Sequence, residues 1–122
     1  MAEKKVLIVD DEENIRLLYK DAFEADGYTV ALSDGREPIL EVLRREAPNV
    51  VVLDIKLNQK ISGLDLLQEI RSTNTTLPVI LSTAYDSFQH DMKSIAADHY
   101  VVKSVDLTEL KAKVASFFEE QN

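Results

Sequence analysis

Short apolar runs alternate along this sequence with segments in which apolar residues recur at helical spacing, and this alternation restricts the fold more than any other feature. The apolar runs, rich in valine, isoleucine and leucine, predict strands at 6–9, 28–32, 50–53, 79–81 and 100–102. The helix-periodic segments predict helices at 14–26, 34–46, 63–72, 86–97 and 106–119. Strands that alternate with helices are typical of a parallel sheet covered by helices on both faces.

The order of these elements also limits the topology. The run at 50–53 is apolar throughout, as expected of a strand that is buried on both faces. Because crossovers between parallel strands are right-handed, few arrangements remain. We predict an α/β fold with a doubly wound five-stranded parallel sheet in the order 2-1-3-4-5, a flavodoxin-like (βα)5 architecture. The length of 122 residues fits a single domain over 1–122.

Several residues mark the expected helix ends and buried faces. Gly27 is suited to end the first helix. The sequence Asp34-Gly-Arg-Glu37 resembles a capping box for the second helix, with Pro38 in its first turn. Asp106 is suited to cap the last helix. The residues expected to face the core from the first and last helices are Ile15, Leu18, Ala22 and Phe23, and Leu107, Leu110, Val114 and Phe117.

Composition excludes several classes of protein. The chain has no cysteine, so it offers neither a disulfide framework nor a thiol nucleophile. Its net charge of −8 argues against direct binding of nucleic acid, which depends on cations that neutralise phosphates. No apolar run approaches the ~20 residues that span a bilayer, and the acidic start does not fit a signal peptide, so we expect a cytoplasmic protein without membrane contact.

Polar residues of particular types follow four of the predicted strands. Asp10 and Asp11 follow the first strand and Asp54 the third, Ser82-Thr83 follow the fourth, and Lys103 follows the fifth. In a parallel sheet these ends lie along one edge, where ligands of open α/β sheets bind. Each residue alone has an ordinary explanation, since an aspartate at a strand end usually caps a turn and a lysine there is usually solvated. Their combination predicts a site.

The chemistry of this combination points to phosphoryl transfer. Two carboxylates about 6 Å apart repel by roughly 3 kcal/mol at an effective dielectric constant near 20, so three together favour a bound cation. Carboxylate oxygens suit Mg²⁺, which shares its coordination sphere with phosphates and water. A carboxylate nucleophile, a metal ion, an ammonium and a hydroxyl are the groups that transfer of a phosphoryl group to an aspartate requires.

This arrangement resembles the response-regulator receiver family over nearly the whole chain. Five matching segments occur in order: VLIVDDE at 6–12, VVVLDI at 50–55, SGLDLL at 62–67, PVILSTA at 78–84 and ADHYVVK at 97–103. Each segment is weakly specific alone, whereas five in order at near-family spacing are highly specific. The resemblance implies a phosphorylation switch in two-component or phosphorelay signalling.

The resemblance also implies roles for single residues at the phosphorylation site. Asp54 would accept a phosphoryl group from a histidine kinase or phosphotransfer protein. Asp11 and Asp54 would bind Mg²⁺ directly, Asp10 would assist through water, and the backbone carbonyl of Lys56 would complete the protein ligands. Lys103 would pair with the phosphoryl group. The domain would catalyse only its own phosphoryl transfer and slow dephosphorylation.

A second set of implied roles concerns the signal. Thr83 would rotate to hydrogen-bond the phosphoryl group, and Tyr100 would turn inward into the vacated space. This movement would change the face formed by the fourth helix, fifth strand and fifth helix, where a downstream partner would bind. The chain could be a stand-alone receiver, or the receiver of a longer regulator whose output domain would follow Asn122.

The sequence departs from the family pattern in three places. Ser104 stands after Lys103 where the family usually has proline, often with a cis bond, and a cis bond before serine would cost ~3–4 kcal/mol. The loop after Asp54 lacks the usual proline. Lys56 and Tyr85 occupy positions that influence the lifetime of the phosphorylated state in the family. The two histidines, at positions 90 and 99, have no second soft ligand nearby and receive no metal role.

Three other functions compete with the switch as explanations of these residues. A receiver-like interaction module that is not phosphorylated is compatible with the altered 103–104 bond and loop, although the complete acid set and Lys103 argue against it. A Mg²⁺-dependent phosphatase with an aspartyl nucleophile usually has a second acid two residues later, where this chain has Lys56. A nucleotide-binding protein would need a glycine-rich phosphate loop, and the chain has only three glycines.

Overall fold

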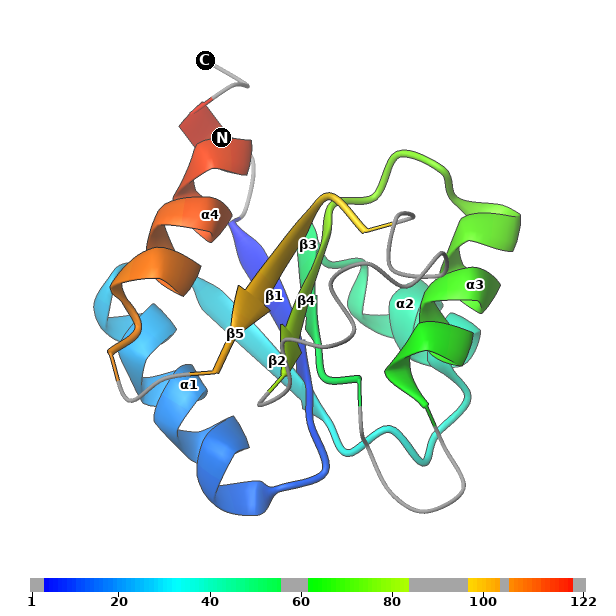
Figure 1. Ribbon diagram of the computed structural model, residues 1–122, viewed down its shortest axis with the longest axis horizontal. Coiled ribbons are helices and arrows are strands. Elements are labelled where there is room, and N and C mark those ends of the chain that lie inside the picture. The colour runs from blue at the N-terminus through cyan, green and yellow to red at the C-terminus, as the bar shows by residue number, and fades with distance from the viewer. Residues whose placement is uncertain (1–3, 56–61, 84–96, 104–105, 120–122) are drawn as a thin grey trace.

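The computed structural model describes residues 4–55, 62–83, 97–103 and 106–119, and within them it forms one parallel sheet flanked by helices (Figure 1). The strands are β1 (Lys5–Val9), β2 (Thr29–Ser33), β3 (Val50–Leu53), β4 (Val79–Thr83) and β5 (His99–Val102). The helices in the described part are α1 (Glu13–Ala25), α2 (Ile39–Glu46), α3 (Gly63–Thr73) and α4 (Thr108–Glu119). The expected helix at 86–97 falls almost entirely outside the described residues.

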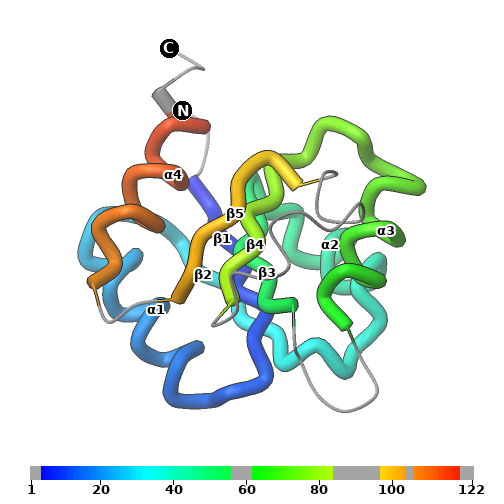
Figure 2. The backbone as a smooth tube through the Cα atoms, viewed as in Figure 1, coloured from blue at the N-terminus to red at the C-terminus, as the bar shows by residue number. Residues whose placement is uncertain are grey.

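The strand order is β2-β1-β3-β4-β5, which confirms the predicted topology (Figure 2). β1 pairs with both β2 and β3, so Val9 lies beside Ser33 on one side and Leu53 on the other. From β1 the chain adds β2 on one side of the sheet and then adds β3, β4 and β5 on the other side. The boundary between β1 and β3 is therefore the switch point, where the direction of strand addition reverses. The carboxyl ends of all five strands lie along one edge, as predicted.

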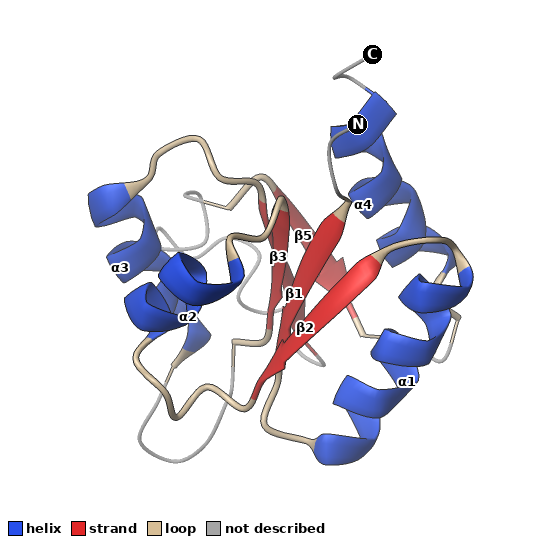
Figure 3. Ribbon diagram, turned by 180° about the vertical axis from the view of Figure 1, so that it is seen from behind, coloured by secondary structure: helices blue, strands red, loops and turns tan. Residues whose placement is uncertain are grey.

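Helices cover both faces of the sheet, with α2 and α3 on one face and α1 and α4 on the other (Figures 1 and 3). Alternate strand residues divide between the two layers, because successive side chains of a strand point to opposite faces. Leu7, Leu53 and Leu81 pack in the layer of α2 and α3, whereas Ile8 and Ile80 pack in the layer of α1 and α4. None of the described helices is long and apolar enough to cross a membrane.

The buried face of α1 differs from the expected one. Leu18 is 48% exposed, whereas Tyr19 and Phe23 are buried and Ile15 is partly buried against the same core. The residues at i, i+4 and i+8 therefore form the inner stripe, and Tyr19, which the apolar pattern did not include, is its centre. The end of the helix matches the prediction, since Gly27 has a φ of +94° and the N–H of Tyr28 donates to the carbonyl of Phe23.

The start of α2 was predicted wrongly. The helix begins at Ile39 after Pro38, whose ψ of 126° is not helical, and no capping box forms. The side chain of Asp34 instead accepts a hydrogen bond from the N–H of Arg36 within the preceding turn. A residue before proline disfavours helical dihedral angles, so Glu37 could not continue a helix into Pro38.

The last helix follows the predicted pattern with one addition. Asp106 accepts a hydrogen bond from the N–H of Thr108, as expected of a residue that caps this helix. Leu110 and Val114 are buried, and Phe117 is partly buried against the same core, with its ring 5.3 Å from that of His99. Phe118, which the sequence pattern did not single out, is also buried, and the Nζ atom of Lys4, the residue before β1, lies 5.8 Å from the centre of its ring.

Asp98 joins three elements at the edge opposite the predicted site. Its Oδ2 atom accepts hydrogen bonds from the backbone N–H of Val79 at 2.8 Å and from the guanidinium of Arg71 at 3.0 Å. Arg71 in turn donates to the backbone carbonyl of Leu77 at 2.7 Å. One carboxylate therefore fixes the end of α3 and the starts of β4 and β5.

We predict that Asp98→Ala lowers the free energy of unfolding by about 1–3 kcal/mol, because the Val79 N–H loses its side-chain acceptor and the Arg71 guanidinium loses its carboxylate partner. Urea unfolding measures the change. Asp21→Ala, at an exposed position of α1, serves as the matched control and should stay within ~0.5 kcal/mol of wild type. Equal stabilities for the two variants would contradict a structural role for Asp98.

Candidate functional site

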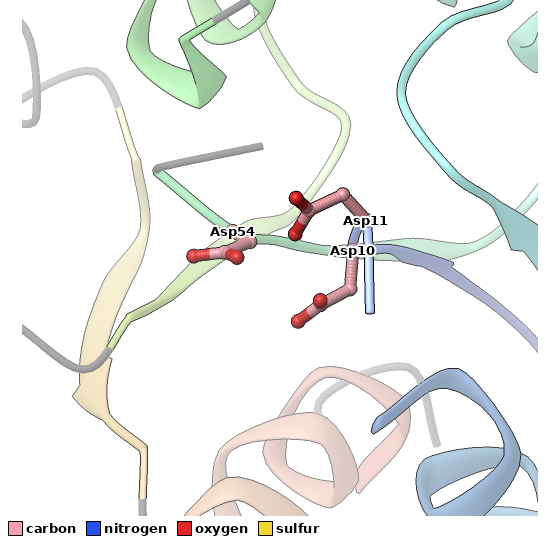
Figure 4. Close-up of side chains that lie close together, drawn as sticks. All are labelled: Asp10, Asp11 and Asp54. Carbon is pink, nitrogen blue, oxygen red and sulfur yellow. The ribbon is translucent and has the colours of Figure 1, made fainter. Parts of the chain in front are cut away.

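Three carboxylates meet where β1 and β3 end (Figure 4). Asp10, Asp11 and Asp54 each place an oxygen within 4.8 Å of the others, an arrangement that could hold a metal ion. Asp10 and Asp54 are buried and Asp11 is exposed, so the group opens to solvent on one side only. The sheet creates this proximity, because the N–H of Asp54 donates to the carbonyl of Val9 and so aligns the ends of the two strands.

Asp10 also supports the start of α1. Its Oδ1 atom accepts a hydrogen bond from the N–H of Glu12 at 2.9 Å, and its backbone carbonyl accepts one from the Arg16 guanidinium at 2.7 Å. Glu12 precedes the first helical residue, so Asp10 caps the turn before α1 and not the helix itself, and this contact uses only one of its carboxylate oxygens. The other oxygen, Oδ2, lies 2.7 Å from the ammonium nitrogen of Lys103.

Lys103 links the two buried carboxylates. Its Nζ atom lies 2.7 Å from Oδ2 of Asp10 and 3.2 Å from Oδ2 of Asp54. The backbone N–H of Lys103 donates to the carbonyl of Thr83 at 2.6 Å, which fixes the end of β5 against β4. Burial disfavours the ammonium, but the hydrogen bond to Asp10 and the charges of Asp54 and Asp10 outweigh it and raise the pKa of Lys103. Lys103 is thus held as a cation inside the site.

The other predicted residues in the described part lie on the neighbouring strands. Thr83 is fully buried at the end of β4, the strand next to Asp54. Tyr100 lies on β5 beside Leu81 and packs, partly buried, against the core layer of α2 and α3. The roles of Thr83 and Tyr100 as a switch pair remain predictions. Lys56, Tyr85, Ser104 and His90, and with them the 103–104 bond and the loop after Asp54, lie outside the described residues.

Gly63 contacts the backbone of the site directly, and sequence reasoning assigned it no role there. Its N–H donates to the carbonyl of Ile55 at 2.6 Å, and a Cβ atom at this position would lie 1.8 Å from the carbonyl oxygen of Asp54. Only glycine permits this approach of α3 to the end of β3. The SGLDLL segment contained this glycine, but sequence alone does not show which backbone it meets.

Tyr19 is a second residue whose place near the site the sequence did not indicate. It is buried between α1 and the sheet, with the hydroxyl of Ser82 as its polar neighbour. Burial raises the pKa of the Tyr19 phenol, and the nearby charges of Lys103, Asp10 and Asp54 also act on it. The phenol is therefore a neutral group next to a charged site.

A family model described as the response regulator receiver domain matches residues 6–115. The chain belongs to this family. The match confirms the resemblance inferred from the five sequence segments and covers β1 through most of α4.

Relatives of this receiver chain include regulators that are longer than it is. Regulatory protein AtoC of Escherichia coli K12 is 33% identical over 123 residues, which cover 99% of this chain and 26% of AtoC. The probable transcriptional regulator ycf27 of Guillardia theta is 34% identical over 122 residues, which cover 98% of this chain and 47% of ycf27. The chain thus spans about half the length of ycf27 and about a quarter of AtoC.

Solved structures show the same receiver fold. The response regulator TrrA from Thermotoga maritima, in complex with Mg²⁺–BeF, has a TM-score of 0.88 and 40% identity, with 93% of this chain and 98% of TrrA covered. TrrA in complex with the histidine kinase ThkA has a TM-score of 0.84 and 42% identity, with 93% of this chain and 97% of the solved chain covered.

We predict that Gly63→Ala destabilises the receiver and also disturbs the carboxylates, because the added methyl group overlaps the Asp54 carbonyl. The expected loss is about 1–3 kcal/mol in the free energy of unfolding, together with weaker Mg²⁺ binding by calorimetry. Gly27→Ala is the control: it is strained at a φ of +94° but has nothing within 4 Å and lies far from the site. Equal Mg²⁺ affinities for the two variants would argue against this contact.

A pH dependence follows from the raised pKa values of Tyr19 and Lys103. The unfolded chain releases these protons near pH 10.0 and 10.5, whereas the folded protein keeps them to higher pH. The free energy of unfolding should therefore fall as pH rises above 10. Tyr19→Phe removes the tyrosine contribution, so its stability should fall less steeply than that of wild type in alkaline chemical denaturation. Parallel curves would contradict the burial of an ionisable phenol.

Proposed function

We propose that residues 1–122 form a single receiver domain that accepts a phosphoryl group on Asp54 in two-component or phosphorelay signalling. The observation that carries this proposal is the placement of Asp10, Asp11, Asp54 and Lys103 within direct reach of one another at the carboxyl edge of the sheet. The solved complexes of TrrA with Mg²⁺–BeF and with a histidine kinase support it by similarity.

The donor set fits a Mg²⁺ ion. Three carboxylates and one ammonium carry a formal charge of −2, which a divalent cation balances, and their oxygens are the hard ligands that Mg²⁺ prefers. Asp11 and Asp54 would bind the ion directly, with Asp10 assisting through water and the backbone carbonyl of Lys56 as a further ligand. When bound, Mg²⁺ neutralises charge on the transferred phosphoryl oxygens.

The transfer itself uses the carboxylate of Asp54 as the nucleophile. A carboxylate oxygen of Asp54 attacks the phosphorus of a phosphohistidine on a kinase or phosphotransfer protein. The new P–O bond forms as the P–N bond breaks. The electron pair of the P–N bond returns to the histidine nitrogen. Lys103 contacts Asp54, so its ammonium would lie within reach of a phosphoryl oxygen, over which the charge of the transition state is spread.

The new phosphoryl group would then change the neighbouring strands. It adds about −2 charges next to the buried hydroxyl of Thr83, on the strand adjacent to Tyr100. Rotation of Thr83 toward the phosphoryl group, coupled to inward rotation of Tyr100, would alter the surface around β5. The partner that reads this surface would be a downstream protein or an output domain that follows Asn122. We expect the domain to act in the cytoplasm, without direct contact with nucleic acid or membranes.

We predict that incubation with acetyl phosphate and Mg²⁺ adds the mass of one phosphoryl group to the wild-type protein and none to Asp54→Asn. The amide is close in size to the carboxylate but is not a nucleophile of comparable strength. Intact-protein mass spectrometry measures the addition. Asp21→Asn, at an exposed position of α1, is the matched control and should be phosphorylated like wild type. Removal of Mg²⁺ with a chelator should abolish the addition.

A negative result must be tested with the natural type of donor, because small phosphodonors do not serve every receiver. The experiment should then be repeated with a phosphorylated histidine kinase and by addition of beryllofluoride. A folded wild-type protein that responds to neither would rule out the switch. It would leave a receiver-like interaction module that acts without phosphorylation.

A further inference from the structure

Ser82 presents a buried hydroxyl that the proposed function does not use. It lies near the end of β4, it is 2% exposed, and its Oγ atom makes no hydrogen bond of ordinary geometry with the described part of the chain. Strand alternation places Ser82 in the layer of α1 and α4, on the same side as Ile80. Buried hydroxyls without partners are rare in folded proteins, so this one calls for an explanation.

A second hydroxyl lies in the same apolar layer. Tyr19 projects from α1 into the core beside Ile8 and Ile80, and its phenol faces Ser82. Two hydroxyls in a layer otherwise built from aliphatic and aromatic groups are unfavourable unless polar atoms or water complete their hydrogen bonds. The pair therefore indicates a polar position within this layer.

The two hydroxyls lie on the wall of a cavity that also reaches Lys103. Tyr19, Ser82 and Lys103 line one cavity of about 350 Å³ between α1, β5 and the start of α4. A cavity of this size holds several water molecules, and polar groups on its wall give them partners.

Lys103 has hydrogen-bonding capacity left for such partners. An ammonium has three N–H donors, and the contacts with Asp10 and Asp54 account for two of them. Both carboxylates lie at the carboxyl edge of the sheet, whereas the cavity lies on the side of α1 and α4. The third donor has the cavity available to it, and the hydroxyls of Tyr19 and Ser82 are acceptors on the cavity wall.

We propose that Tyr19 and Ser82 are positioning residues for Lys103: their hydroxyls, through water in the cavity they share with Lys103, accept the third N–H of its ammonium. This third contact keeps the ammonium nitrogen within contact distance of both Asp10 and Asp54. It also leaves Lys103 with a hydrogen-bond partner when one of its carboxylate contacts is exchanged for a phosphoryl oxygen. The positioning itself needs only the described geometry, whereas its effect on phosphoryl transfer rests on the proposed function.

The direct test follows the ammonium hydrogens of Lys103 by ¹⁵N NMR, with the signal assigned by its loss in Lys103→Arg. Tyr19→Phe and Ser82→Ala should each speed exchange of these hydrogens with water by at least about threefold, as loss of one hydrogen bond of modest strength predicts. Tyr28→Phe removes a tyrosine hydroxyl near the opposite edge of the sheet and should leave the exchange rate unchanged.

Unchanged exchange in folded Tyr19→Phe and Ser82→Ala would overturn the proposal and leave both residues as core packing. If Tyr19→Phe does not fold, Ser82→Ala decides the question, because the hydroxyl that it removes makes no hydrogen bond of ordinary geometry with the described part of the chain. Exchange can be measured without phosphorylation, so this result stands even if the wild-type protein accepts no phosphoryl group.

Phosphorylation kinetics test the consequence separately. Tyr19→Phe should slow the reaction with acetyl phosphate and Mg²⁺ by at least about threefold, and should have no further effect in a Lys103→Ala background if it acts through Lys103. An equal slowing in both backgrounds would contradict action through Lys103. A wild-type protein that accepts no phosphoryl group would refute the proposed function and not the positioning.

Discussion

The contact of one lysine with two buried carboxylates is the interaction on which the site depends. Lys103 holds Asp10 and Asp54 at 2.7 and 3.2 Å, although these residues end strands that are far apart in the sequence. Without a cation between them, two buried carboxylates in such proximity would repel each other strongly. In the proposed function, the same ammonium that stabilises the resting site would also meet the charge of the phosphoryl group.

The sheet and its glycine contact provide the rigidity that this arrangement needs. Parallel pairing fixes β1 beside β3 and β5 beside β4, so the carboxylates and the lysine reach the same edge from different strands. Gly63 lets α3 approach the Asp54 carbonyl closely, and Asp98 ties the opposite edge to α3. Contacts at both edges of the sheet therefore fix the strands that carry the charged groups.

The sequence predicted the sheet order and the meeting of the strand-end acids and lysine because both depend on short-range patterns. Apolar runs mark buried strands, and the residue after each run must lie at the carboxyl edge. The start of α2 differs from the prediction because Pro38 disfavours helical dihedral angles at Glu37, so the capping pattern at Asp34 forms a turn and not a helix start. Tyr19 and Gly63 were missed for a different reason: their importance comes from a cavity and a close backbone approach, which arise only when distant segments pack together. The chemical roles of Thr83 and Tyr100 remain predictions.

Reduction of the phosphorylated protein with borohydride tests the central claim most directly. An acyl phosphate on an aspartate is reduced to homoserine, so peptide mass spectrometry identifies the residue that carried the phosphoryl group. The account predicts homoserine at position 54 after treatment with phosphodonor and Mg²⁺, and unmodified aspartate at positions 10 and 11. Homoserine at another position, or none in a protein that gained a phosphoryl group, would contradict the assignment of Asp54 as the acceptor.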